Sequence, residues 1–390
     1  MTGAFVAVTG ATLAFFVYVG MLVVSVPRYV ENELGAGEFG VGLTVASFAT
    51  AAIAVRPLIG WSADRFGRRP MMMVGATIAA VAGGSLGLTD ALWQVLVLRA
   101  FTGVGEAALF VGGASLIADL APAHRRAEAA SYFSVAVFGG IGIGPAIAET
   151  LTGDDRYGRT FIAAGAVAVV AALLVIAIPG RVDTRRIRGP MTMVLIHRAA
   201  LWPGLVLASG IAAYTAFVAF LPEYSREVGL GGAAALFAAY SVLSVVLRLS
   251  AATLPERLGV ARTVTFALVT MGIGLAIAAS VPTVRGLWTA TLVIAVGMAF
   301  LYPSLMAIVA NGVGDDERAR AMASFTMFFE AGSVVGGLML SGVGQLLGKR
   351  SSFAMGVVMA MVGLVVLWTR VVRAPPSTSE TEPSAPLRTM

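Results

Sequence analysis

The sequence contains no cysteine, which excludes disulfide bonds and any thiolate metal site. Histidine is nearly absent too. Its two copies, His124 and His197, lie in polar loop segments, so no histidine metal site is expected within the apolar segments. Charged residues make up only 12% of the chain, about half of the ~25% that soluble domains carry. A chain this poor in charge cannot cover its surface against water.

Apolar residues replace the missing charge, at 58% of the chain with a mean hydropathy of +0.88. An α-helix needs about 20 such residues to cross a bilayer. Twelve spans of this kind are predicted, at 4–27, 39–62, 70–89, 92–118, 128–151, 160–179, 200–222, 232–254, 262–281, 286–310, 321–346 and 352–372. We therefore expect an all-α integral membrane protein with twelve transmembrane helices in contact with the lipid bilayer.

A polar segment at 180–199 divides these spans into two sets of six. We expect an N-terminal half at 1–179, a linker at 180–199, a C-terminal half at 200–373 and a disordered tail at 374–390. Lys and Arg gather in the loops after the even-numbered spans, which places the linker and both termini in the cytoplasm. This topology accounts for the net charge of +6, so no nucleic-acid partner is expected.

The two halves repeat one another at a nearly constant offset of 192 residues. The matched positions include rare charged residues and glycines: Arg56 and Arg248, Asp64 and Glu256, Gly67 and Gly259, Asp119 and Asn311, Arg126 and Arg318, Gly144 and Gly336. Parallel repeats of this kind are related by an axis along the membrane normal. We therefore expect two pseudo-symmetric six-helix halves.

The loop after the second span carries one motif, whose positions are Gly60, Asp64, Arg65, Gly67, Arg68 and Arg69. Gly67 permits a tight turn with positive φ. The motif resembles the signature of the major facilitator superfamily, G-x-x-x-D-R-x-G-R-R/K. The resemblance implies that Asp64 and Arg68 clamp the cytoplasmic side, with Asp119 as a partner of Arg68. The second copy, at 255–259, lacks the double arginine, so we expect the gating residues mainly in the first half.

The fourth span contains Arg99 and, two helical turns later on the same face, Glu106. A charge inside a span is costly, so it must be paired, hydrated or functional. The segment resembles a second motif of the same superfamily, R-x-x-x-G-x-G, which implies that Arg99 influences the protonation of a nearby acid. Alternatively, Arg99 reaches the outer interface or pairs with an acid as part of the packing.

The fifth span carries Gly140, Gly144 and Pro145, in a pattern that resembles the antiporter motif of proton-coupled exporters in this superfamily. Gly-x-x-x-Gly allows close helix packing, and proline bends a helix by removing a hydrogen bond. The resemblance implies an exporter whose fifth span seals the cavity. The motif's usual closing glycine pair is replaced here by Ala148 and Glu149.

Three carboxylates fall within spans and are candidate proton sites: Glu106, Glu149 and Glu330. Desolvation favours the neutral form of such an acid, as for Glu330 among Phe and Met residues. A neutral helix-to-helix contact is the alternative. Arg56 and Arg248 match under the repeat and lie about 12 Å along a helix before the acid of the loop motif, so we expect a structural role at the cytoplasmic entrance.

Five aromatic residues are candidates for lining a substrate cavity: Tyr18, Tyr214, Phe217, Tyr240 and Phe328. Packing is the alternative reading for each of them. No phosphate-binding loop motif occurs, so a proton gradient rather than ATP or a cofactor is expected as the energy source.

Together these features predict a transporter of the major facilitator fold and not an enzyme. The expected function is proton-coupled efflux of a small lipophilic compound or drug, by a monomer in the plasma (inner) membrane. A symporter or a sugar or metabolite permease is the alternative, and the sequence does not identify the substrate.

Overall fold

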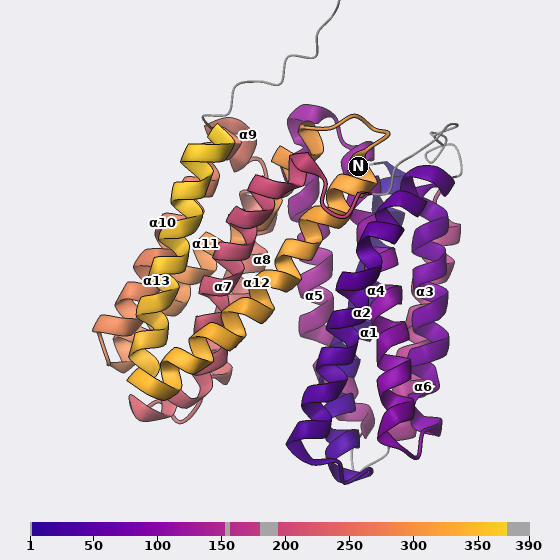
Figure 1. The fold of residues 1–390 in the computed structure, drawn as a ribbon, viewed down its shortest axis with the longest axis horizontal. Coiled ribbons are helices and arrows are strands. Elements are labelled where there is room, and N and C mark those ends of the chain that lie inside the picture. The colour runs from indigo at the N-terminus through magenta and orange to yellow at the C-terminus, as the bar shows by residue number, and fades with distance from the viewer. Residues whose placement is uncertain (1, 153–156, 180–193, 373–390) are drawn as a thin grey trace, which may run out of the picture.

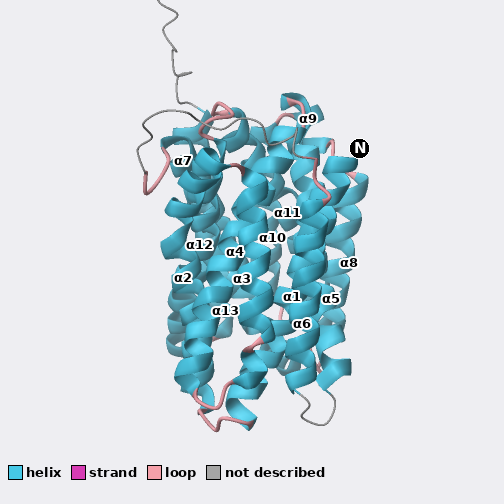
Figure 2. Ribbon diagram, turned by 90° about the vertical axis from the view of Figure 1, so that its right-hand side faces the viewer, coloured by secondary structure: helices cyan, strands magenta, loops and turns pink. Residues whose placement is uncertain are grey.

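The computed structural model describes residues 2–152, 157–179 and 194–372. These residues form helices and connecting turns, without a strand (Figure 2). The long helices are α1 (Gly3–Asn32), α2 (Gly37–Phe66), α3 (Arg68–Gly84), α4 (Leu92–Leu120), α5 (Arg126–Thr152), α6 (Tyr157–Ile176), α7 (Arg198–Glu227), α8 (Ala234–Ser250), α10 (Val260–Ser280), α11 (Val284–Asn311), α12 (Arg318–Leu347) and α13 (Lys349–Val366). The predicted twelve-helix fold is confirmed. Residues 180–193 of the predicted linker, and the predicted tail, lie outside the described residues.

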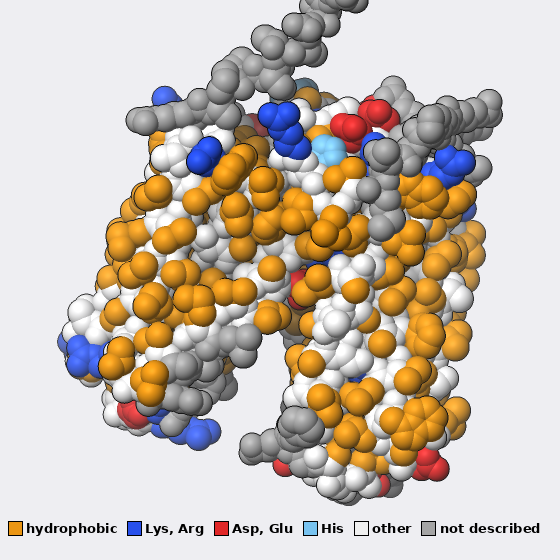
Figure 3. Space-filling model, in the orientation of Figure 1, with side chains coloured by type: hydrophobic (Ala, Val, Ile, Leu, Met, Phe, Trp, Pro, Cys, Tyr) orange, Lys and Arg blue, Asp and Glu red, His pale blue; other side chains and the backbone are white. Residues whose placement is uncertain are grey.

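Ten of the described helices are long and apolar enough to cross a membrane, and α8 and α12 complete the set. Hydrophobic side chains cover much of the visible flank of each half (Figure 3). The eighth predicted span, 232–254, is too long. Its helix ends at Ser250, and a separate short helix, α9 (Leu254–Leu258), carries Pro255 in its first turn. Proline lacks an N–H and favours the start of a new helix over the continuation of α8.

The helices form two bundles that follow the repeat. In the N-terminal half α1 packs against α5 and α3 against α4, and in the C-terminal half α7 packs against α12 and α10 against α11. The halves meet where α2 contacts α12 and where α5 contacts α8 and α11. Segments far apart in the sequence, such as Arg56 and Thr326 at a separation of 270 residues, therefore form the central interface.

The halves converge at the end that carries the N-terminus and spread apart at the other end (Figure 1). Figure 3 shows the resulting cleft, which is deep and open between the two halves. We call the converging end, with Asp64, Asp119 and Arg318, the closed end. The opposite end, with Glu227 and Lys349, is called the open end.

Candidate functional site

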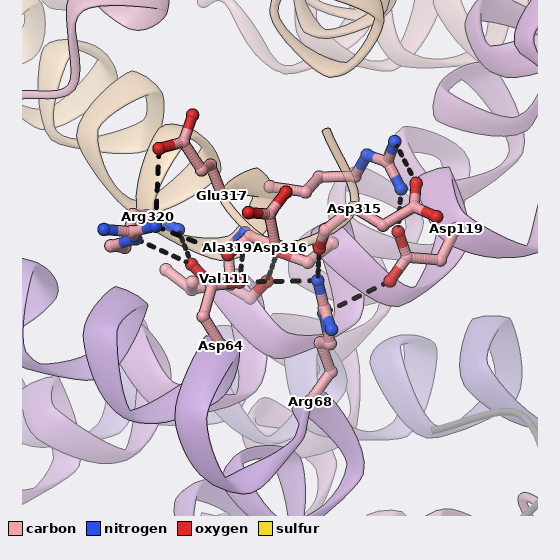
Figure 4. Close-up of polar contacts among 11 residues, drawn as sticks. Asp64, Arg68, Val111, Asp119, Asp315, Asp316, Glu317, Ala319 and Arg320 are labelled. Atoms are coloured by element: carbon pink, nitrogen blue, oxygen red, sulfur yellow. Dashed lines mark hydrogen bonds and ion pairs between the residues drawn. The ribbon is translucent and has the colours of Figure 1, made fainter. Parts of the chain in front are cut away.

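The closed end is held by Asp64, a fully buried acid near the end of α2 (Figure 4). Its carboxylate accepts hydrogen bonds from the backbone N–H groups of Ala319 and Arg320, at 3.0 and 3.1 Å. The guanidinium groups of Arg320 and Arg68 also contact it, at 3.1 and 3.3 Å. Free N–H groups and a positive dipole end make a helix N-terminus a good partner for an anion. Asp64 of one half thus caps α12 of the other.

A second set of contacts lies beside this cap. Arg68 is buried and contacts the Asp119 carboxylate at 3.2 Å, and it also donates to the Asp315 carbonyl of the other half. Asp119 in turn pairs with Arg318 at the start of α12. The expected contact between Arg68 and Asp119 is therefore present, and it extends across the interface (Figure 4).

The second copy of the motif makes the equivalent contacts, which the sequence did not lead us to expect. Glu256 accepts a hydrogen bond at 2.7 Å from the backbone N–H of Glu128, in the first turn of α5. Arg126 donates to the side chain of Asn311 at 2.7 Å. Under the offset of 192 these pairs match the cap by Asp64 and the pair of Asp119 with Arg318. Contacts across the closed end therefore come from both copies of the motif, because a cap needs one carboxylate and not the double arginine.

Two glycines of the motif shape this junction. Gly67 has φ of 109° between α2 and α3, as predicted, and Gly259 repeats it at 88°. A side chain at Gly60 would place its Cβ 2.7 Å from the Cβ of Ala323 on α12. Gly60 therefore allows α2 to approach the other half closely.

Two further arginines of the motif make contacts inside the N-terminal half. Arg69 donates to the carbonyls of Val175 and Ile176, at 3.2 and 2.8 Å, and so caps the end of α6. The guanidinium of Arg65 lies 5.8 Å from the ring centre of Trp61 on its own helix. Both contacts stay within the N-terminal half.

About two-thirds of the way along α2, toward the closed end, Arg56 joins three helices. Its side chain is 1% exposed and contacts Glu106 of α4 at 3.0 Å and Glu330 of α12 at 3.3 Å. It also donates to the carbonyl of Thr326 on α12 at 2.5 Å. Two candidate proton sites, one from each half, therefore share one guanidinium. Arg56 lies about 12 Å along α2 from Asp64 of the closed end, as its spacing in the sequence predicts.

These three charged groups face a central cavity of about 160 Å³. The other lining residues are mostly aromatic or aliphatic: Phe16, Val19, Phe48, Phe110, Ser134, Val137, Phe138, Ile141, Tyr302, Thr326 and Phe329. The side chain of Glu330 is 22% exposed and that of Glu106 is 7% exposed. Glu330 is thus the more accessible acid of an otherwise apolar chamber.

Arg248 occupies the repeat-equivalent position on α8 and is also buried. It donates to the carbonyls of Met298 and Ser134, at 3.1 and 3.5 Å, and lies 4.4 Å from the ring centre of Phe138. The offset of 192 relates Ser134 to Thr326, Phe138 to Glu330 and Met298 to Glu106. Arg248 thus repeats the geometry of Arg56, with neutral groups where Arg56 meets carboxylates.

Arg99 lies on the same helix as Glu106, whose carboxylate pairs with Arg56 instead. Among the described residues it makes no ion pair. It lies 4.6 Å from the ring centre of Phe48 and 3.5 Å from the hydroxyl of Thr102. Arg99 and Glu106 share a face of α4, but Glu106 forms its ion pair with Arg56 of the neighbouring helix α2. Spacing along one helix could not reveal a partner on another.

None of the five predicted aromatic residues lines the central cavity. Tyr214, Phe217 and Tyr240 form a cluster between α7 and α8, in which the rings of Tyr214 and Tyr240 stack at 5.4 Å. Tyr18 packs against Gly83 of α3, and Phe328 packs against Gly204 of α7. Their spacing did not show which way each helix face turns. The side chain of Glu149 lies outside the described residues.

The glycines of the fifth span pack against α1. A side chain at Gly144 would meet the backbone nitrogen of Met21 at 2.6 Å, and one at Gly140 would meet the carbonyl oxygen of Leu13 at 2.8 Å. Pro145 lies inside the same helix. The motif therefore brings the two backbones into direct contact, next to the wall of the cavity.

Replacing Gly144 with valine is expected to lower the thermal stability of the protein in detergent. Overpacking costs about 1–3 kcal/mol, and here backbone atoms, which adapt poorly, oppose the new methyl groups. Gly142 is the matched control, because a Cβ there meets no atom within 4 Å. Equal melting temperatures for Gly144→Val and Gly142→Ala would contradict this packing.

Several residues of the site escaped the sequence analysis. They are Arg320 and Arg318 at the closed end, Glu256 as a cap, and the aromatic lining of the cavity. The repeat carried a usable signal, since Arg126 and Arg318 match under the offset, as do Asp119 and Asn311. The two matched pairs are the residues that contact each other across the halves: Asp119 with Arg318, and Asn311 with Arg126.

Comparisons with known proteins agree with this geometry. A sequence model of the Major Facilitator Superfamily matches residues 7–257 and 232–389. An uncharacterised MFS-type transporter of Salmonella typhimurium is 26% identical, over 92% of this chain and 94% of its own. Multidrug resistance protein 1 of Bacillus subtilis is 32% identical over 42% of each chain. Quinolone resistance protein NorA of Staphylococcus aureus is 23% identical over 54% of this chain and 56% of its own.

Two solved structures share the fold. The human organic anion transporter MFSD10 superposes with a TM-score of 0.81 and 15% identity, over 94% of this chain and 99% of its own. The proton:xylose symporter XylE superposes with a TM-score of 0.80 and 14% identity, over 95% of each chain. With the family match over nearly the whole chain, these findings identify a membrane transporter and not an enzyme: the chain belongs to the Major Facilitator Superfamily.

Proposed function

We propose that this transporter exports small lipophilic organic compounds in exchange for protons, by alternating access. The observation that carries the proposal is the contact of Arg56 with Glu106 and Glu330, one acid from each half, at the wall of the central cavity. Relatives named for multidrug and quinolone resistance support the choice of substrate class.

The charges of this site suit proton coupling. When both acids are ionised, two carboxylates share one guanidinium, and one negative charge is left over in a mostly apolar chamber. Desolvation makes that charge costly, so a proton or a cationic substrate is favoured there. Glu330 is the more exposed acid, and therefore the one that a proton from the open end meets first.

Protonation at Glu330 would weaken a contact between the halves. Glu330 and Thr326 belong to α12, whereas Arg56 belongs to α2. A neutral Glu330 leaves Arg56 paired within its own half, to Glu106. A bound proton thus changes the energy of one arrangement of the halves relative to another, which is what coupling requires.

The cavity walls favour apolar cargo. Aromatic rings from six different helices line it, including Phe16, Phe48, Phe110 and Tyr302. Such walls bind flat organic molecules through burial of area and offer few polar groups to select one compound. A proton and a cationic cargo molecule would each neutralise the same surplus negative charge. Their binding is therefore mutually exclusive, as antiport requires.

The basic loops support a plasma-membrane orientation with the closed end and both termini on the cytoplasmic side. The cleft then faces the outside, the arrangement in which an exporter releases its cargo and takes up a proton. The cavity is enclosed by helices of one chain, which supports a functional monomer.

Transport in proteoliposomes tests the proposal. With an acidic lumen and tetraphenylphosphonium outside, an antiporter concentrates the cation in the lumen, whichever way the protein is inserted. This probe carries a permanent charge, so a pH gradient alone cannot trap it. Protein-free liposomes and a gradient collapsed with nigericin serve as controls. Accumulation only when the outside is the acidic side would indicate a symporter, and none in either direction would overturn the proposal for this class of cargo.

A further inference from the structure

We propose that an ion pair between Glu31 of α1 and Arg226 of α7 closes the open end when the closed end parts. The pair joins the two rims of the cleft, with one residue from each half. The proposal rests on the alternating access proposed above and does not depend on which cargo is carried. It adds the contact that holds the second conformation together.

The last turns of α1 and α7 are anchored alike in the two halves. An offset of 195 residues relates these turns and matches Tyr29 with Tyr224. Both tyrosines are buried, and their hydroxyls donate to the carbonyls of Thr89 and Ala278, at 2.5 and 3.1 Å. Thr89 lies just beyond α3, and Ala278 lies in the last turn of α10. Repeat-equivalent helices therefore hold the two helix ends in the same way.

A second pair of contacts repeats beside the tyrosines. The side-chain amide of Asn32 donates to the hydroxyl of Tyr157 at the start of α6, at 2.9 Å. Lys349 at the start of α13 contacts Glu227 at 2.5 Å. The offset of 195 matches Asn32 with Glu227, and the offset of 192 matches Tyr157 with Lys349. Each helix end is thus fixed to two neighbours within its own half.

Glu31 and Arg226 occupy equivalent places on these ends and carry opposite charges. Each lies two residues after an anchoring tyrosine, about 200° further round the helix, and so points away from the face that buries the tyrosine. Both residues are exposed, and neither makes an ion pair within the described part of the chain. The helix dipole favours a cation such as Arg226 in a C-terminal turn, but it disfavours Glu31 there. The acid on α1 is therefore not explained by its own helix.

The rims around these two residues also differ in charge. Among the described residues of the open end, acids outnumber bases in the N-terminal half, and bases outnumber acids in the C-terminal half. The N-terminal set is Glu31, Glu33, Asp90, Arg28 and Arg159, and the C-terminal set is Arg226, Arg285, Lys349, Arg350 and Glu227. Figure 3 shows acidic side chains along the lower rim of the N-terminal half and mostly basic ones along that of the C-terminal half. Surfaces of opposite potential attract and steer one another into register.

The repeat brings Glu31 and Arg226 toward each other when the open end closes. The lower parts of α1 and α7 flank the cleft (Figure 1). Parallel repeats are related by an axis along the membrane normal, so closing the cleft moves equivalent helix ends together. Identical copies would carry the same charge on both ends and would repel. With an acid on one end and an arginine on the other, the same approach forms an ion pair.

Distances between spin labels test the pair, in a chain whose only cysteines are the introduced ones. Leu88→Cys and Leu346→Cys label the open end of each half, at uncharged side chains that are 85% and 84% exposed. Asp64→Asn supplies molecules with a parted closed end, because Asp64 holds that end together. We expect short distances to appear in this background, and Glu31→Arg or Arg226→Glu to lower the ratio of short to long distances at least fivefold. Combining the two reversals should restore the ratio to within twofold.

Arg285→Glu is the matched control, since it changes the charge of the same rim by the same amount. Arg285 lies in the first turn of α11, and its repeat-equivalent residue is Trp93, which is not an acid. We expect a ratio within twofold of the background. Salt gives a further readout, because raising the ionic strength from about 0.05 M to about 0.5 M screens exposed charges. The ratio should fall with salt in the background, and should fall less when Glu31→Gln and Arg226→Gln are combined.

Crosslinking tests the approach of the two helix ends without their charges. Glu31→Cys combined with Arg226→Cys should form a disulfide at least tenfold faster with Asp64→Asn than with Asp64 in place. Short distances between the spin labels without this crosslink would show that the ends of α1 and α7 do not meet, and would overturn the pair.

The charge reversals can also overturn the ion pair while the export proposal stands. Unchanged ratios in both single reversals would do so, as would a combined variant no better than either one. An equal loss in Arg285→Glu and Arg226→Glu would replace the pair with a general attraction between the rims. If the distances behave as expected but tetraphenylphosphonium is not transported, export is overturned and the ion pair stands.

Discussion

Glu330→Gln is expected to abolish pH-driven exchange, with a loss of at least tenfold in proton-dependent transport. Glutamine keeps the size and the polarity of the side chain but cannot ionise. The site is then fixed in a state that resembles protonated Glu330, with Arg56 paired to Glu106. Binding of tetraphenylphosphonium should survive because the apolar walls are unchanged, whereas its dependence on pH should flatten. Transport and equilibrium binding in reconstituted protein, each measured from pH 5 to 9, separate these two effects.

Glu227→Gln is the matched control for this prediction. Glu227 pairs with Lys349 at the open end, at 2.5 Å, where its side chain is 52% exposed. An exposed ion pair contributes about 0–1 kcal/mol, so its loss should leave exchange nearly unchanged. If Glu330→Gln kept the pH dependence of wild type while Glu106→Gln lost it, proton coupling would belong to the acid of α4 instead.

Asp64→Asn is expected to open the closed end in a large fraction of molecules. Asp64 accepts two backbone hydrogen bonds from α12 and forms ion pairs with Arg320 and Arg68. The contacts with α12, which belongs to the other half, exist only in the closed arrangement. Hydrogen bonds to charged groups contribute about 1.5–3 kcal/mol each. Losing the charge should therefore shift the balance of conformations by roughly 10²-fold, since about 1.4 kcal/mol corresponds to a factor of ten.

Paired spin labels can measure this shift without removing any native thiol, because the chain has no cysteine. Phe66→Cys and Leu258→Cys are equivalent under the repeat, lie one in each half, and replace side chains that are 49% and 51% exposed. Their separation should lengthen in Asp64→Asn. Glu256→Gln is the internal comparison and should lengthen it less, because Glu256 accepts a single backbone hydrogen bond, at 2.7 Å. Equal effects of the two variants, or no lengthening in either, would contradict the unequal weight of the caps.

The sequence predicted the fold well because long apolar segments and the positions of breaks are local properties of the chain. The turn at Gly67, with its positive φ, follows from neighbouring residues in the same way. The predicted span at 232–254 is too long for a local reason as well. Pro255 favours the start of a separate helix, α9, and α8 ends before it at Ser250.

The partners of the site were harder to predict because they depend on how helices rotate and cross. Arg99 and Glu106 share a face of α4, yet α2 brings Arg56 to Glu106 instead. Phe328 and Phe329 are neighbours in sequence, but only Phe329 turns toward the cavity, while Phe328 packs on α7. Successive residues point about 100° apart around a helix, and this difference determines which of them faces the cavity. In a helix that is apolar on all sides, hydropathy does not indicate that direction.

The cap by Glu256 bears on how a duplicated protein drifts apart over time. One partner of this contact is main chain, so among substitutions of Glu128 only proline removes the N–H that Glu256 binds. Only the acid must persist, whereas a pair of side chains is lost when either member mutates. The residue equivalent to Arg68 under the repeat is Val260, and the cap is present without an arginine there. In a degenerate copy of the motif, the acid at this position therefore indicates a helix cap better than the basic residues around it do.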